Sequence, residues 1–209
     1  MEGSAAKGGT AAGTRRVTSG MRPTGSIHLG NLHGALENWI RLQNEYDCYY
    51  FIVDWHALTT PGGDGAVGYE HVGDLRRNVH EMAVDWLAAG LDPGTCAIFV
   101  QSHVPEVAEL HLLFSMITPL GWLERNPTYK DMVQGYRIEN PSYGLLGYPT
   151  LQSADILAYK GDFVPVGKDQ EAHVNMTRDL AQRFNSLYGA DVFPITRALL
   201  AETARVPGL

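Results

Sequence analysis

Short runs of β-branched and aromatic residues recur along this 209-residue chain, and they constrain the possible folds most. Such runs are typical of buried strands when turn-forming residues bound them. They lie at residues 49–53, 97–100 and 163–166, with a shorter candidate at 16–19. Helical stretches separate them, and strand-helix alternation is the pattern of parallel sheets. We therefore expect an α/β fold with a doubly wound, Rossmann-like parallel sheet.

Two of the intervening stretches have the spacing of amphipathic helices. Residues 32–42 and 79–87 each place their apolar side chains on one helical face. Gly90 and Pro93 follow the second stretch and are expected to end that helix. Both stretches are therefore predicted helices of the α/β layers.

The region 105–150 has a different organisation. Helical pieces are expected near 110–116 and 129–134, and a Gly- and Pro-containing loop is expected at 140–149. We interpret this region as a helical insertion between the two halves of the sheet. Ligands of doubly wound sheets bind at the carboxyl ends of the strands near the switch in strand order, so functional motifs should cluster there.

Composition bounds the class of protein. Hydrophobic residues make up 44% of the chain, which suffices for one main domain, 17–209. Residues 1–16 are rich in Gly, Ala, Ser and Thr, so we expect a disordered or added tail there. No apolar run is long enough for a membrane span, and the net charge of −7 argues against binding DNA or RNA over the whole surface. Two cysteines without metal-ligand spacing favour a cytoplasmic protein that holds no metal of its own.

The densest motif is SGMRPTGSIHLGN at residues 19–31, where a strand leads through a turn into a helix near Gly30. Exposed backbone amides at a helix start suit a phosphate. His28 could donate a hydrogen bond to a phosphoryl oxygen, and Gly30 lets a flat ring approach the backbone. The alternative is that Gly and Pro only shape a turn and that His28 caps a helix.

A second motif, YPTLQSAD, occupies residues 148–155. Gln152 and Asp155 are three residues apart and would share one helix face, with Pro149 suited to the helix start. Asp155 could accept a hydrogen bond from an indole N–H and so reject analogues without that donor. The alternatives are a salt-bridged helix acid for Asp155 and a solvated polar residue for Gln152.

The third motif, VPVGKDQ at 164–170, places a strand end at Gly167 before a further helix. Backbone amides at such a junction again suit a phosphate. A P-loop is excluded, because the spacing from Gly161 is one residue too long and Asp169 stands where Ser or Thr must bind magnesium. His173, just beyond, is expected to be a satisfied helix histidine, and the remaining histidines show no metal spacing.

Together these motifs resemble the class I aminoacyl-tRNA synthetases, and the tryptophanyl branch in particular. HLGN at 28–31 is similar to the His-x-Gly-His signature of that class, while SGMRPTG, QSADILAY and VPVGKDQ are similar to tryptophanyl segments. The resemblance runs over 17–209. It implies a catalytic domain that activates L-tryptophan with ATP to an adenylate and transfers it to tRNA(Trp), as a tryptophan–tRNA ligase.

The resemblance also implies roles for individual residues. His28 and Asn31 would be catalytic, with Mg²⁺ arriving on ATP. ATP binding would involve Arg22, Pro23, Thr24, His28, Gly30, Asn31, Gly167, Lys168, Asp169 and Val206. Tryptophan binding would involve His56, Tyr148, Gln152, Asp155, Val164, Val166 and Gln170. Within that set, Asp155 would bind the indole nitrogen, Tyr148 and Gln170 the α-amino group, and the two valines the ring. Lys168 stands where the family usually carries Glu, which puts that contact in doubt.

In the family, residues 206–209 lead into a lysine-rich KMSKS-type loop and then an anticodon-binding domain. Neither is in this sequence, so we expect an impaired fragment of a homodimeric enzyme. Three alternatives stay open. These are a tyrosyl-tRNA synthetase, a small nucleotidyltransferase with a His-x-Gly-His loop, and a non-catalytic amino-acid-binding module.

Overall fold

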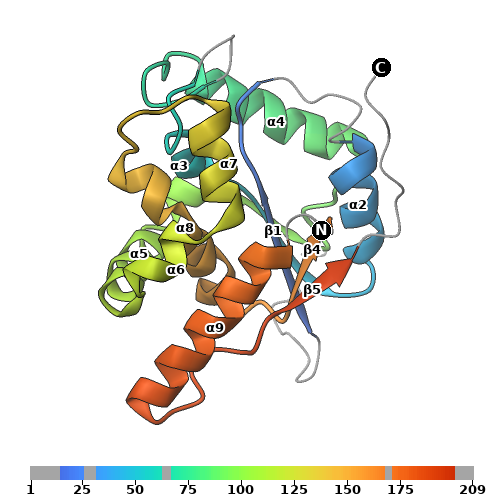
Figure 1. Cartoon of the computed structure of the whole chain (residues 1–209). Coiled ribbons are helices and arrows are strands. Elements are labelled where there is room, and N and C mark those ends of the chain that lie inside the picture. Colours follow the sequence, from blue (N-terminus) through green and yellow to red (C-terminus); the bar gives the residue numbers. More distant parts are fainter. Residues whose placement is uncertain (1–14, 26–31, 63–66, 168–170, 201–209) are drawn as a thin grey trace.

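The computed structural model describes residues 15–25, 32–62, 67–167 and 171–200 (Figure 1). In this part of the chain, five parallel strands form one sheet in the order β3-β2-β1-β4-β5. The strands are β1 (Arg16–Met21), β2 (Asp47–Ile52), β3 (Ala97–Val100), β4 (Phe163–Val166) and β5 (Arg197–Leu200). The order reverses between β1 and β4, which is the switch of a doubly wound sheet. The expected fold class is confirmed, although β5 was not predicted.

Helical segments connect the strands. They are η1 (Leu32–Leu36), α2 (Glu37–Leu42), α3 (Asp54–Ala57), α4 (Leu75–Ala89), η2 (Gln101–His103), α5 (Glu106–Ile117), α6 (Leu120–Glu124), α7 (Pro127–Gly135), α8 (Tyr143–Ala158) and α9 (Glu171–Tyr188). The predicted helix at 32–42 is confirmed, with a π-helical first part, η1. Gly90 caps α4 in the left-handed region at φ 115°, which confirms the predicted end of that helix.

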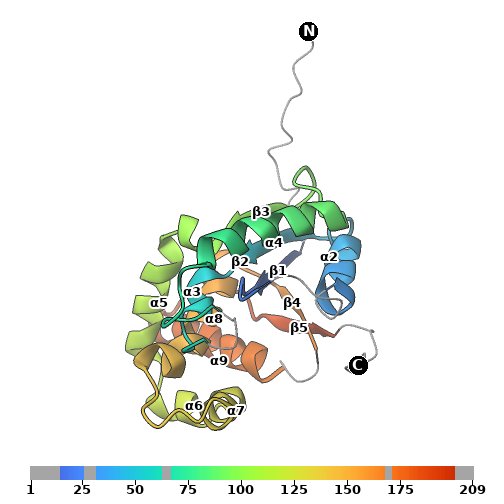
Figure 2. The ribbon, with the colours of Figure 1, turned by 90° about the horizontal axis from the view of Figure 1, so that it is seen from above.

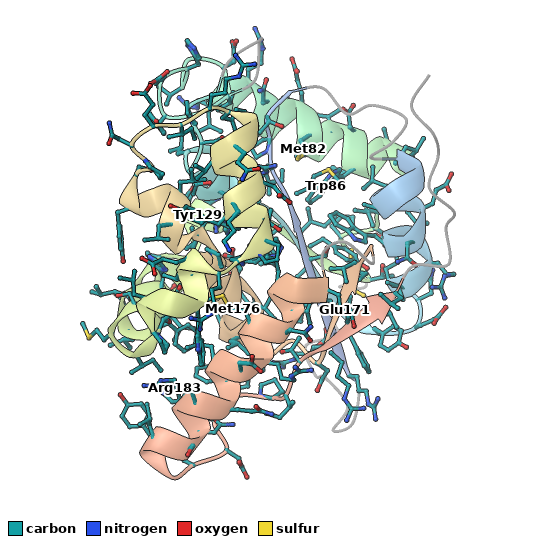
Figure 3. All side chains as sticks on the ribbon, in the orientation of Figure 1. Met82, Trp86, Tyr129, Glu171, Met176 and Arg183 are labelled. Atoms are coloured by element: carbon teal, nitrogen blue, oxygen red, sulfur yellow. The ribbon has the colours of Figure 1, made fainter. Side chains whose placement is uncertain are left out.

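One face of the sheet is covered by α2 and α4, and the other by α8 and α9 (Figure 2). Met82 and Trp86 extend from α4 toward the sheet (Figure 3). The Trp39 ring stacks on Tyr50 at 4.6 Å and meets Trp86 edge-on at 5.1 Å. These buried aromatic rings fix α2 and α4 against the sheet.

A second apolar core joins α5, α8 and α9 through buried residues such as Phe114, Leu157 and Leu180. The segment between β3 and β4 is therefore helical, as predicted. Asn126 begins α7, because its side-chain oxygen accepts hydrogen bonds from the backbone N–H groups of Thr128 and Tyr129. Within the described residues, no helix is both long and apolar enough to cross a lipid bilayer.

A loop was expected at 140–149 and a helix start at Pro149. Both expectations are wrong, because α8 begins at Tyr143 and continues through Pro149. The Ser142 hydroxyl accepts a hydrogen bond from the Leu145 N–H at 3.1 Å and so forms the true N-cap. Proline inside a helix removes one backbone hydrogen bond. Helix α8 tolerates this loss because it is buried against α5 and α9, and packing outweighs local propensity.

Candidate active site

A cavity of about 590 Å³ lies at the carboxyl ends of β1 and β4, where the strand order reverses. The two strands pair at Val17 and Phe163. Beyond that pair, the cavity is lined by residues 18–22 on the β1 side and by residues 164–167 on the β4 side. The helical segments η1, α2, α3, α7, α8 and α9 contribute further wall residues, as do β2 and the residues just after β2 and α3. This is the position at which doubly wound sheets bind their ligands.

Asp155 of α8 is the buried carboxylate of this cavity, with only 2% of its surface exposed. The Gln101 Nε2 donates to both carboxylate oxygens, at 2.7 and 2.9 Å, and the His56 Nε2 lies 2.9 Å from Oδ2. The other end of the Gln101 amide accepts the Trp55 N–H at 3.1 Å. Because a backbone N–H can only donate, this contact fixes the amide with its NH₂ group toward Asp155.

The hydrogen bonds define what Asp155 can do. Both of its oxygens accept from Gln101, and Oδ2 also contacts the His56 Nε2. A carboxylate offers about four acceptor positions, and three are occupied by these contacts. One position is left for a donor from a ligand in the cavity, such as an N–H or O–H group.

Tyr148, also from α8, lines the same cavity, and its hydroxyl lies 3.0 Å from the His173 Nε2 of α9. Burial raises the pKa of Tyr148 to about 12, so its phenol is neutral at ordinary pH. A phenol oxygen has two lone pairs, so the Tyr148 hydroxyl can accept a hydrogen bond from a ligand cation while it is bonded to His173. His173 itself is buried and lines the cavity.

The cavity also has apolar walls. Val164, Val166 and Ile156 line it together with Phe51 and Met132. Gln152 lies on the same face of α8 as Asp155 and reaches the same space, which matches the three-residue spacing in the sequence. A flat apolar ring could therefore lie between these walls while a polar edge faces the carboxylate.

Most of the site residues that the sequence suggested, where described, meet in this one cavity. Those that line it are Arg22, Thr24, His56, Tyr148, Gln152, Asp155, Val164, Val166 and Gly167. Pro23 does not line it; this residue is buried, and its carbonyl accepts from the Asn78 side chain at 3.2 Å. His28, Gly30, Asn31, Lys168, Asp169, Gln170 and Val206 lie outside the described residues.

Several site residues were missed from the sequence. Gln101 donates a hydrogen bond to Asp155, which lies 54 residues further along the chain, and no local sequence pattern predicts that contact. Thr128 and Met132 reach the cavity from α7, in the region interpreted as an insertion. Among the described residues there is no group of three or more side chains suited to hold a metal ion.

Comparison with known proteins places this site in a family. Residues 11–206 match the model of the class I tRNA synthetases, tryptophanyl and tyrosyl. A protein of Ralstonia nicotianae named tryptophan–tRNA ligase is 58% identical over 84% of this chain and 42% of its own length. A Thermotoga maritima protein with that name is 49% identical over 92% of this chain and 57% of its own length. The chain thus spans about half the length of these relatives.

Solved structures of tRNA synthetases also superpose on this chain. A tryptophanyl-tRNA synthetase from Campylobacter jejuni, complexed with ADP and tryptophan, superposes with a TM-score of 0.80 at 37% identity, over 91% of this chain and 56% of that one. A tyrosyl-tRNA synthetase from Archaeoglobus fulgidus reaches a TM-score of 0.67 at 20% identity, over 88% of this chain and 55% of that one. The second likeness concerns the fold alone.

Proposed function

This chain belongs to the class I tRNA synthetases of the tryptophanyl and tyrosyl family, and we propose that its cavity activates L-tryptophan with ATP, as in a tryptophan–tRNA ligase. The observation that carries the proposal is the buried Asp155 carboxylate, held in place with one acceptor position left, beside apolar walls. Indole has one N–H donor and no acceptor, so it matches this arrangement.

In the proposed reaction, the carboxylate of tryptophan attacks the α-phosphorus of ATP. The bond from that phosphorus to the bridging oxygen breaks, pyrophosphate leaves, and tryptophanyl-adenylate remains. A hydroxyl of the terminal ribose of tRNA(Trp) then attacks the activated carbonyl and displaces AMP. Because the substrate supplies the nucleophile, the protein's task in the first step is to align the ligands and stabilise phosphate charge.

The amino acid would lie across β4 and α8. Asp155 would accept the indole N–H, and Val164 and Val166 would pack on the ring. The Tyr148 oxygen would accept from the α-ammonium group, and Gln170 remains an expected partner there. The neutral state of Tyr148 supports that contact, because a phenol bonded to His173 can still accept.

The nucleotide would lie at the ends of β1 and β4. Arg22 and Thr24 line the cavity on one side and Gly167 on the other. The Arg22 guanidinium would balance phosphate charge together with Mg²⁺ that arrives on ATP. His28 and Asn31 keep the catalytic roles that the family signature implies, and Lys168 and Asp169 those of ATP contacts.

Binding of tRNA(Trp) and assembly as a homodimer complete the proposal. A cytoplasmic location fits the two cysteines, which are both buried and free, because reducing compartments keep thiols unpaired. Tyrosine is the rival substrate, since its hydroxyl could also donate to Asp155. The relatives named above favour tryptophan.

The test is amino-acid-dependent exchange of pyrophosphate into ATP, measured beside calorimetric binding of L-tryptophan and L-tyrosine. Exchange that needs tryptophan supports the proposal. Exchange or binding with tyrosine alone would make the chain a tyrosyl enzyme. Tryptophan binding without exchange would favour a non-catalytic binding module, and the absence of binding by either amino acid would refute the assignment of the pocket.

A further inference from the structure

We propose that Gln101 is a positioning residue for tryptophan recognition, which orients the Asp155 carboxylate and the helix that carries His56 without touching the substrate. This inference rests on the proposed function, since it assumes that Asp155 receives the indole N–H. Gln101 is 1% exposed and is not among the residues that line the cavity. Its effect on a ligand must therefore pass through Asp155 and His56, which do line the cavity.

Both ends of the Gln101 amide are used. The Nε2 reaches Asp155 Oδ1 at 2.7 Å and Oδ2 at 2.9 Å, while the carbonyl oxygen accepts the Trp55 N–H at 3.1 Å. A single planar group thus ties the carboxylate on α8 to the start of α3. Rotation of the carboxylate would break at least one of these contacts, so its open acceptor position keeps a fixed direction.

Gln101 also acts on the second partner of Asp155. His56 lies on α3, which has only four residues and is too short to hold its orientation by helix formation alone. Two reciprocal contacts attach α3 to η2, one from the Trp55 N–H to the Gln101 side chain and one from the Ser102 N–H to Asp54 Oδ1 at 3.1 Å. They place the His56 Nε2 beside Asp155 Oδ2.

The chemical consequence is selectivity for a hydrogen-bond donor. Gln101 Nε2 can only donate, so both Asp155 oxygens act as acceptors toward it, and one acceptor position remains for a ligand. A ligand edge that carries N–H or O–H completes the set, whereas an edge without a donor leaves a buried acceptor unpaired. Preorganisation of this kind strengthens binding because the site does not have to reorder when the ligand enters.

Other titratable groups surround this unit. His56 approaches Asp155 from α3, His111 from α5, and Tyr159 from the end of α8. Burial, and then the neighbouring His56, lowers the pKa of His111, while burial and the nearby Asp155 raise the pKa of Tyr159. His111 and Tyr159 are therefore neutral near neutral pH.

The diagnostic substitution is Gln101→Glu, which keeps the acceptor for Trp55 and the size of the side chain but replaces the NH₂ donor by oxygen. At about pH 8 two carboxylates would face each other, and tryptophan affinity should fall about 10- to 100-fold. At about pH 5.5 the two carboxyl groups would share a proton, which restores a donor, so most of that loss should be recovered. A purely structural role would not give a deficit that shrinks as the pH falls.

The matched control is Gln43→Glu. Gln43 is equally a buried glutamine with both ends bonded, to the Gly90 carbonyl at 3.1 Å and the Asp92 N–H at 2.9 Å, but it does not line the cavity or contact Asp155. This variant should lose stability and keep the tryptophan affinity of the wild type at both pH values. A matching loss of affinity in Gln43→Glu would overturn the inference.

The outcomes separate the two proposals. If the wild type binds tryptophan and Gln101→Glu binds it equally well at both pH values, the role of Gln101 is overturned and the proposed function stands. If the wild type does not bind tryptophan, both fall. Should Gln101→Glu fail to fold, NMR of the wild type decides: the side-chain NH₂ signals of Gln101 should shift and exchange more slowly when tryptophan is added, while those of Gln43 stay fixed. Unchanged Gln101 signals would overturn the inference.

Discussion

Replacing Asp155 by alanine should destabilise the fold as well as the proposed binding site. The substitution removes the acceptor of the Gln101 NH₂ group and the hydrogen-bond partner of the His56 Nε2. Gln101 and His56 are buried, with 1% and 7% of their surface exposed. Each buried donor left unpaired costs about 1–3 kcal/mol. His56 can move its proton to the other ring nitrogen and so avoid part of its share. We therefore expect a loss of about 2–4 kcal/mol, which overlaps the about 3–5 kcal/mol usual for removing one partner of a buried ion pair.

Urea unfolding followed by circular dichroism measures this difference directly. Asp179→Ala is the matched control, because the side chain of that aspartate on α9 is 51% exposed and pairs with its neighbour Arg178. Surface changes of this type stay within about 0.5 kcal/mol. An Asp155→Ala variant as stable as the control would refute the account of the buried hydrogen-bond unit. In that case Gln101 and His56 would have other partners in the folded chain.

Two further perturbations test the packing and the buried thiols. Gly161→Ala would place a methyl group 2.5 Å from the buried Thr18 hydroxyl and should cost about 1–3 kcal/mol in unfolding experiments, whereas Gly135→Ala meets no atom within 4 Å and should be neutral or slightly stabilising. Burial raises the pKa of both Cys48 and Cys96 from 9.0 to about 11, so the stability that their protonated thiols contribute is present below pH 9 and lost as the pH rises toward 11. The free energy of unfolding, measured by urea titration between these pH values, should fall less steeply in the double variant Cys48→Ala, Cys96→Ala, by up to about 1.4 kcal/mol per pH unit for each thiol. Equal slopes in the variant and the wild type would contradict the assignment.

The sheet was predictable where its strands are buried runs of β-branched and aromatic residues. The run 49–53 corresponds to β2, for example, and 97–100 matches β3. Strand β5 was not predicted, because its four residues, Arg197–Leu200, are partly buried or exposed and do not alternate between apolar and polar side chains. It is defined by its ladder with β4, which is a tertiary contact that a local pattern does not contain.

Helix boundaries were predictable where capping chemistry is local. Gly90 ends α4 as expected, because only glycine adopts φ 115° without strain. At Pro149 the local preference gave a wrong prediction, a helix start, whereas the residue lies inside α8. Proline favours the first turn of a helix, and that preference holds for Pro127 at the start of α7. At Pro149 burial of the whole helix overrides it.

Residues of the candidate site were also predictable where their relation is local in the sequence, and not where it depends on tertiary contacts. Gln152 and Asp155 were paired correctly because three residues on one helix face are a local relation. Gln101 could not be found, since its partners Trp55 and Asp155 are 46 and 54 residues away and meet it only in the folded chain. Thr128 and Met132 were missed for the same reason, as α7 reaches the cavity through tertiary packing.

Asp155 is proposed to recognise the indole N–H of tryptophan, and a change in the ligand rather than in the protein tests this on the wild-type chain without any risk of misfolding. Calorimetry would compare L-tryptophan with its benzothienyl analogue, in which sulfur replaces N–H at nearly the same ring shape. We expect the analogue to bind about 10- to 100-fold more weakly, because it leaves the buried carboxylate with an unpaired acceptor position. Equal affinity for the two ligands would contradict the account.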